Sequence, residues 1–118
     1  MDKKFEIDFL GDAIDFLNDL DDKTRKKIYY NARKAQILNN PELFKKLTEF
    51  IWEFRTLYDK KYYRILAFWD KTDKTDILVL VTHGFVKKTK KTPKSEIKKA
   101  EDIRKAYFEQ KAKKNGKR

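Results

Sequence analysis

The chain has 118 residues, the size of one domain, and 40% of them are hydrophobic, which is enough for a packed core. It contains no cysteine and a single histidine, which excludes disulfides, cysteine-ligated metals and clusters of histidine ligands. The net charge of +11 is uneven, because residues 87–118 carry 14 Lys and Arg against 4 Asp and Glu, whereas residues 1–86 carry 16 against 15. Such a field attracts polyanions, of which nucleic acid is the commonest, although a solvated helix face with a lysine-rich tail would have the same composition.

The amino-terminal residues lack the basic segment followed by a long apolar segment that marks a signal peptide. No apolar run approaches the length of a membrane span, which is about 18 residues or more. The sequence therefore predicts a cytoplasmic protein with no membrane contact, no metal and no cofactor. We expect a single domain over residues 1–118, with the last few residues disordered.

The amino-terminal third of the chain reads as one strand followed by helices. Apolar and charged residues alternate over residues 3–10, which predicts a short half-buried strand. Apolar residues then recur at helical spacing in residues 12–20 and again in residues 23–38, so we expect two helices or one bent helix. Pro41 suits the first turn of a further short helix.

From Phe50 onward the pattern changes from helical to alternating. Two segments rich in aromatic and branched residues flank the polar turn at residues 59–61, which predicts a β-hairpin. A second polar connection, residues 70–76, follows the hairpin. The middle of the chain therefore contributes two neighbouring antiparallel strands.

The last third of the chain reads as a strand and a helix. Residues 77–81 form the most apolar run, which suits a central strand, and residues 82–92 are expected to leave the sheet. A final amphipathic helix over residues 95–113 begins near Pro93. The order of elements predicts an α+β fold, with N-terminal helices and a C-terminal helix packed on a small, mainly antiparallel sheet.

Three segments resemble one protein family: WEFR at residues 52–55, YYRILAF at residues 62–68 and HGFVKKTKKTPKSEIKKA at residues 83–100. They look like the HigB-type, phage-derived branch of the RelE/ParE toxin superfamily, and the resemblance covers most of the chain in the right order and spacing. The sequence departs from the family pattern at Phe54, where an aliphatic residue is commoner, and at residues 56–61, where a glycine-bearing turn is frequent.

The resemblance implies a RelE-like microbial ribonuclease fold and the toxin of a type II toxin-antitoxin system. It further implies ribosome-dependent endoribonuclease activity that cleaves mRNA and inhibits translation. The implied partners are the ribosome, mRNA and a cognate antitoxin, which often carries a helix-turn-helix domain. Two alternatives stay open: a ParE-like toxin that inhibits DNA gyrase by binding it, and a non-catalytic basic RNA-binding protein.

Metal-independent RNA cleavage needs stabilisation of the charge on the phosphorane, a task that suits arginine and lysine. Arg64 stands on an otherwise apolar strand face, so we expect it to be partly buried and to need an anion, either a protein carboxylate or a phosphate. Arg55 is expected to face away from the core, as a phosphate ligand or as the ion-pair partner of Glu53. Lys87 follows the apolar strand closely enough to reach a phosphate as well.

His83 could serve as a general acid or base near neutral pH, because the ordinary pKa of histidine is about 6.5. Its spacing puts it in phase with Val79 and Val81, so it could equally be a hydrogen-bonded residue at the edge of the core. The two interpretations stand side by side at this point.

The residues around His83 and Lys87 are candidates for RNA contacts. Lys88 could reach a phosphate, whereas Lys90 and Lys91 would contact ribosomal RNA or simply face water. Phe85 could stack on a base or close the core, and Gly84 would allow a bulge or a close approach of the backbone to the substrate.

Overall fold

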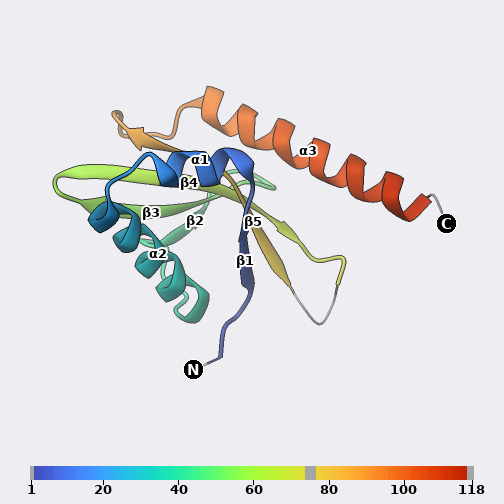
Figure 1. The fold of residues 1–118 in the computed structure, drawn as a ribbon, viewed down its shortest axis with the longest axis horizontal. Helices are drawn as coiled ribbons and strands as arrows, with labels where there is room; N and C mark the ends of the chain where they lie inside the picture. The colour runs from blue at the N-terminus through green and yellow to red at the C-terminus, as the bar shows by residue number, and fades with distance from the viewer. Residues whose placement is uncertain (1, 74–76, 117–118) are drawn as a thin grey trace.

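The computed structural model describes residues 2–73 and 77–116 of the chain, with side chains up to residue 114. Within these residues the fold is α+β, as the sequence predicts (Figure 1). No helix in this part of the chain combines the length and the apolar composition of a membrane span. The elements are β1 (Glu6–Phe9), α1 (Gly11–Asn18), α2 (Asp22–Ile37), β2 (Phe44–Lys46), β3 (Trp52–Tyr58), β4 (Lys61–Asp70), β5 (Leu78–Lys87) and α3 (Lys94–Gly116).

The strands form one sheet in the order β1-β5-β4-β3-β2. β3, β4 and β5 make an antiparallel meander, and β2 adds to it antiparallel at one edge. β1 pairs parallel with β5 at the other edge, with Glu6 opposite Leu78 and Phe9 opposite Val81. The sheet is therefore mainly antiparallel, as expected, with its first and last strands side by side.

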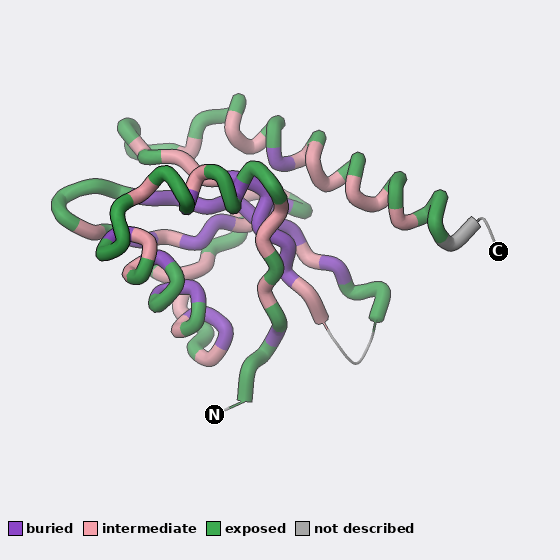
Figure 2. Tube along the Cα trace, viewed as in Figure 1, coloured by how far each residue is buried: buried purple, intermediate pink, exposed green. Residues whose placement is uncertain are grey.

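Helices cover both faces of the sheet (Figure 1). The larger core cluster joins α1 and α2 to one face and includes Leu17, Ile28 and Val81. A smaller cluster joins α3 to the other face around Leu66 and Phe68. Figure 2 shows that α3 is mostly exposed or half-buried, and Ala100 is its one completely buried residue among those described.

The two amino-terminal helices are separate rather than one bent helix. The carboxylate of Asp21 accepts hydrogen bonds from the backbone N–H and the hydroxyl of Thr24 at the first turn of α2. These bonds stabilise the ionised carboxyl and lower the pKa of Asp21. Asp21 therefore caps α2 and sets the point where the second helix begins.

The short helix expected at Pro41 is wrong, because residues 44–46 form the edge strand β2. Phe44 lies opposite Phe54 in the ladder, and its ring stacks on the rings of Phe54 and Trp52 at centroid distances of 4.2 and 4.8 Å. The apolar pattern there is too short to stabilise a helix, whereas pairing with β3 satisfies the backbone and buries these rings.

The prediction that residues 82–92 leave the sheet is wrong for residues 82–87, because β5 continues to Lys87, and is confirmed for residues 88–92. A β-bulge lies in its middle: Val81 pairs with Ala67 and His83 pairs with Leu66, so Thr82 is an extra residue. The Thr82 hydroxyl donates to the carbonyl of Leu66, 3.2 Å away. The bulge reverses the alternation, so His83 does not share the face of Val81 but points toward α3.

A buried polar network attaches the second half of α3 to the end of β4. The carboxylate of Asp70 accepts hydrogen bonds from Tyr107 and Lys111 at 2.6 Å each and from Thr72. Burial alone would raise the pKa of Asp70, but these donors lower it well below its usual range. Burial and the bond to Asp70 raise the pKa of Tyr107 to about 12.

Candidate anion-binding site

The register of the meander brings the four predicted catalytic residues onto one face of the sheet. Arg55 lies opposite Arg64, and Arg64 lies opposite Phe85. His83 is one row away on β5, and Lys87 ends the strand in the next row on the other side. Directly paired and alternate residues share a face, so all four side chains lie on the side of α3.

Glu53 is the carboxylate at the centre of this face. It is 2% exposed, and its two oxygens lie 3.6 Å from Nε of Arg64 and 3.6 Å from Nε of Arg55. The hydroxyl of Thr92, in the segment between β5 and α3, donates to Oε1 of Glu53 over 2.6 Å. We call Glu53, Arg55, Arg64 and Lys87 the arginine cluster.

The two arginines are incompletely paired. Nε of Arg55 and Nε of Arg64 are both buried, and neither has a hydrogen-bond partner in the described part of the chain. The 3.6 Å contacts with Glu53 are ion pairs but too long for hydrogen bonds. Among the described residues, the side chain of Arg64 donates only to the carbonyl of Tyr63, at 3.1 Å, and it lies over the ring of Tyr62. Both guanidinium groups therefore have donors left for an anion.

The charges of the arginine cluster do not balance. Burial lowers the pKa of Arg64, and the neighbouring charge of Arg55 lowers it further, while Glu53 opposes the shift. Burial likewise lowers the pKa of Lys87, with further contributions from Arg64, Arg55 and Lys45. One carboxylate thus faces several cations, and an anion bound among them would relieve their mutual repulsion.

Lys45 was missed by the sequence analysis. It lies opposite Glu53 in the β2–β3 ladder and is exposed. The expected helix at Pro41 hid this position, because only the strand register brings Lys45 to the arginine cluster. Thr92 was missed for a similar reason, although it stands within the resembling segment of residues 83–100.

His83 is held by protein groups at both ring nitrogens. Nδ1 lies 2.9 Å from the hydroxyl of Thr82, and Nε2 lies 3.1 Å from a carboxylate oxygen of Glu96 on α3. The residue is 2% exposed, and its burial lowers the pKa of the imidazole. This geometry suits the attachment of α3 to the sheet, a role for Glu96 that the sequence did not indicate. Proton transfer by His83 stays a prediction.

The remaining predicted RNA-binding residues lie on or beyond the end of β5. Lys88, Lys90 and Lys91 are exposed in the connection to α3, within reach of solvent. Phe85 is half-buried, and its ring lies 6.2 Å from that of His83 and packs in the smaller core cluster. The core interpretation of Phe85 therefore agrees with its packing, and a contact with a base stays a prediction.

Gly84 does not form the β-bulge, which lies at Thr82. The side of Gly84 on which another residue would carry its Cβ faces α1, and a Cβ added there would lie 2.3 Å from Cδ2 of Phe16. The close approach that Gly84 permits is thus to the Phe16 ring and not to the face of the arginine cluster. The prediction of a bulge at this glycine is wrong by two residues.

No group of three or more His, Cys, Asp and Glu side chains that could hold a metal ion occurs within residues 2–73 and 77–114. In the described part of the chain, a five-stranded sheet covered by helices on both faces, with the arginine cluster on the side of α3, defines the class of the protein as a small α+β domain.

The chain belongs to the family described as Phage derived protein Gp49-like (DUF891), whose model matches residues 15–105. This is a family of RelE/HigB-like toxin type, and its members are commonly toxins of toxin-antitoxin systems in the RelE superfamily. None of the curated proteins compared with the chain matches it. The phage-derived toxin family indicated by the sequence is therefore confirmed at this level.

Proposed function

We propose that the chain is a HigB-like toxin of a type II toxin-antitoxin system, a metal-independent endoribonuclease that cleaves mRNA on the ribosome and so inhibits translation. The observation that carries the proposal is the pair of neighbouring guanidinium groups of buried Arg64 and half-buried Arg55, whose Nε donors have no hydrogen-bond partner in the described chain. A phosphate has the charge and the oxygens to accept from both. Family membership supports the toxin class.

In this proposal the 2′-hydroxyl of the RNA loses its proton to solvent as its oxygen attacks phosphorus, and the bond to the 5′-oxygen breaks, leaving a cyclic phosphate and a 5′-hydroxyl. Arg64 and Arg55 stabilise the charge on the phosphorane, because Arg64 is buried and Arg55 half-buried beside it, where electrostatic interactions are stronger than in water. Lys87 suits protonation of the 5′-oxygen, since its lowered pKa makes its ammonium a better proton donor than an ordinary lysine.

The exposed lysines Lys88, Lys90 and Lys91 would bind RNA beyond the cleaved bond, with Phe85 as a base contact at the edge of the arginine cluster. His83 would act as an acid or base if α3 moves, since Glu96 and Thr82 hold both of its nitrogens. The proposed partners are the ribosome, mRNA and a cognate antitoxin, with a helix-turn-helix domain as the expected antitoxin type.

The test adds the purified chain to a translating extract and maps the ends of the messages by primer extension. We expect new ends inside coding regions and loss of protein synthesis. Arg64→Lys keeps the charge but loses the planar set of donors, so cleavage should fall by at least about 100-fold. Arg33→Lys, on the exposed face of α2, is the matched control and should cleave within about twofold of the original chain.

Three results would contradict the proposal. Intact messages with unimpaired protein synthesis would show that the chain does not inhibit translation. Intact messages with blocked DNA replication in cells would indicate the gyrase-inhibiting alternative. Inhibition that is unchanged in Arg64→Lys and falls steeply with salt would indicate RNA binding without cleavage.

A further inference from the structure

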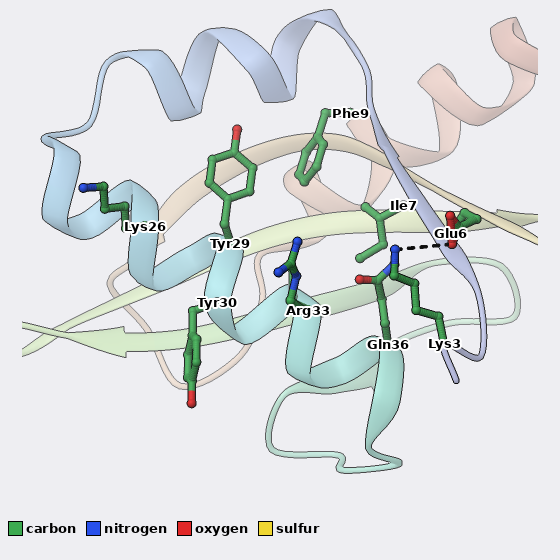
Figure 3. A pocket seen from close by; sticks show the side chains of 10 residues that line it. Lys3, Glu6, Ile7, Phe9, Lys26, Tyr29, Tyr30, Arg33 and Gln36 are labelled. Atoms are coloured by element: carbon green, nitrogen blue, oxygen red, sulfur yellow. Dashed lines mark ion pairs between the residues drawn. The ribbon is translucent and has the colours of Figure 1, made fainter. Parts of the chain in front are cut away.

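A groove runs between β1 and α2 (Figure 3). It lies on the face of the sheet that α1 and α2 cover, opposite the arginine cluster on the side of α3. Its volume is about 420 Å³. β1 and the residues just before it contribute one wall and α2 contributes the other, and the residues that matter here are Lys3, Glu6, Phe9, Lys26, Tyr29 and Arg33. Figure 3 shows Arg33 and Tyr29 extending from α2 into the space beside β1.

In the part of the chain that the structure describes, the edge of the sheet along this groove has no neighbouring strand. β1 is the outermost strand, and no further strand lies beyond it among the described residues. Glu6 and Leu10 donate their backbone N–H groups to the carbonyls of Ile77, just before β5, and of Val81 in β5, each over 2.9 Å. Alternation along the strand therefore turns the backbone N–H and C=O groups of Ile7 and Phe9 outward, where they can pair with another extended chain.

The start of this edge is closed by α2. The side-chain amide of Gln36 donates to the carbonyl of Phe5 at 3.0 Å, and the N–H of Lys4 donates to the carbonyl of Gln36 at 2.7 Å. The open stretch thus begins after Phe5 and lies alongside the middle of α2. Its length suits a short added strand rather than a whole domain edge.

The α2 wall of the groove is cationic and aromatic. Lys26 and Arg33 are exposed, and neither has an ion-pair partner within the described chain. The ring of Tyr29 packs edge-on against Phe9 with centroids 5.4 Å apart, and both line the groove. A chain lying beside β1 would therefore meet positive charge and aromatic surface on the side of α2.

The other side of β1 has the opposite charge. Asp8 is exposed and alternates with Ile7 and Phe9, so its carboxylate lies on the side of the sheet away from α2, whereas Glu6 lines the end of the groove. Lys3 partly neutralises Glu6 at 3.9 Å. Side chains of an added strand that point this way would be neutral or basic. An RNA backbone would be repelled by these carboxylates. It would also leave the outward N–H and C=O groups of Ile7 and Phe9 without the matching partners that a peptide backbone provides, so the edge favours a peptide.

We propose that the outer edge of β1 binds an extended acidic segment of a partner protein as an added strand, with acidic side chains at every second position facing Lys26 and Arg33. Backbone bonds to Ile7 and Phe9 would give affinity, and the two oppositely charged sides would fix the register. The inference goes beyond RNA cleavage and does not depend on it, because the groove and the arginine cluster lie on opposite faces of the sheet.

The test uses a short fluorescein-labelled peptide of alternating glutamate and threonine, and a control peptide of the same composition with its glutamates in one block. We expect the alternating peptide to bind more tightly. Arg33→Glu should weaken its binding by at least about tenfold, whereas Lys23→Glu, exposed on α2 but outside the groove, should change it by less than about threefold. Fluorescence anisotropy measures both.

Two further measurements separate strand addition from general attraction between opposite charges. Amide hydrogen exchange by NMR should slow at Ile7 and Phe9 on peptide binding and stay unchanged at Glu6 and Leu10, which already donate to backbone carbonyls. Peptides N-methylated on all glutamates or on all threonines should differ, since only one set of N–H groups can face β1.

Any one of three results would overturn the proposal. These are equal binding of the alternating and blocked peptides, equal effects of the two methylation patterns, and unchanged amide exchange at Ile7 and Phe9. A single-stranded RNA oligonucleotide that requires Arg33 while the peptide does not bind would overturn it as well, in favour of a nucleic-acid surface. RNA cleavage by Arg33→Glu is measured in parallel, so failure here is distinguishable from failure of the endoribonuclease proposal.

Discussion

The carboxylate of Glu53 and the guanidinium of Arg64 lie 3.6 Å apart across the β3–β4 ladder, with side chains only 3% and 4% exposed. A buried pair of this kind is costly to break, because either partner alone would be left as an uncompensated charge. Yet the pair is too long for a hydrogen bond, and Arg55 shares the same carboxylate. Glu53 therefore keeps the arginines charged and in place while leaving their donors available to a second anion.

Replacing Glu53 by Gln should make the chain depend on an external anion. The variant leaves Arg64 and Arg55 without their carboxylate, so its free energy of unfolding should fall by about 3 kcal/mol. Added inorganic phosphate should restore part of this loss, and it should raise the thermal midpoint of the variant by more than that of the original chain. Thermal unfolding in phosphate and in chloride at equal ionic strength measures the difference.

Glu42→Gln, in the exposed segment before β2, is the control and should show no phosphate-specific shift. Equal phosphate effects on the original chain and on Glu53→Gln would contradict an anion site at the arginine cluster.

His83 should make stability depend on pH near neutrality. Burial lowers the pKa of the folded imidazole, while Glu96 and Asp12 oppose this shift and Lys99 reinforces it. As the pH falls below about 6.5, the unfolded chain takes up the proton first, so the native state loses stability by up to about 1.4 kcal/mol per pH unit until the folded pKa is reached. Urea unfolding at several pH values between 7.5 and 5 measures this slope.

His83→Gln should abolish that part of the slope while leaving the rest of the pH profile unchanged. A slope that persists in the variant would assign the effect to another group.

Asp70→Asn should weaken the attachment of α3. The substitution removes a buried charge that accepts from Tyr107 and Lys111, so the free energy of unfolding at pH 7 should fall by about 2–3 kcal/mol. The folded pKa of Asp70 lies below its unfolded value, so this contribution is complete above about pH 4 and is lost as the pH falls further.

Urea unfolding at pH 7 and at pH 3 should therefore show a smaller difference between Asp70→Asn and the original chain at the lower pH. Asp102→Asn, whose exposed carboxylate contacts Lys98, should change stability by less than about 0.5 kcal/mol at either pH. A constant deficit for Asp70→Asn at both pH values would show that its charge is not the source of the effect.

Gly84→Ala should destabilise the fold without altering the arginine cluster directly. The new methyl group would collide with the ring of Phe16, so the free energy of unfolding should fall by about 1–3 kcal/mol. Phe16→Leu in the same chain should recover part of the loss, because it removes the colliding ring atoms. Chemical denaturation of the two single variants and the double variant measures this coupling. Strictly additive losses would rule out the Phe16 contact as the cause.

Local pattern was enough to find the face of Arg55 and Arg64, because both stand in strands whose alternation is unbroken. It could not place His83, whose side changes at a single extra residue that only the β4 partner reveals. β2 was missed because its three residues form a strand only by pairing with β3, where the ring of Phe44 stacks on that of Phe54. Such contacts between distant segments leave no local trace in the sequence.

The sequence indicated only part of the role of Glu53, the carboxylate that Arg55 and Arg64 share. The spacing of Glu53 and Arg55 indicated an ion pair, but the convergence of Arg64 and Thr92 on the same carboxylate depends on strand register and on the path of the segment before α3. The exposed lysines after β5 needed no such information, because charge runs at the end of a strand are read directly from the sequence.

The parallel pairing of β1 with β5 also orders events during synthesis. β1 can pair with β5 only after Leu78, the partner of Glu6, has left the ribosome. By contrast, β3, β4 and β5 are joined by short connections and can pair as they emerge. Until β5 is made, β1 is an unpaired strand with both edges open to solvent and to other chains. The short length of β1 and the charges of Glu6 and Asp8 limit the danger of aggregation during that interval.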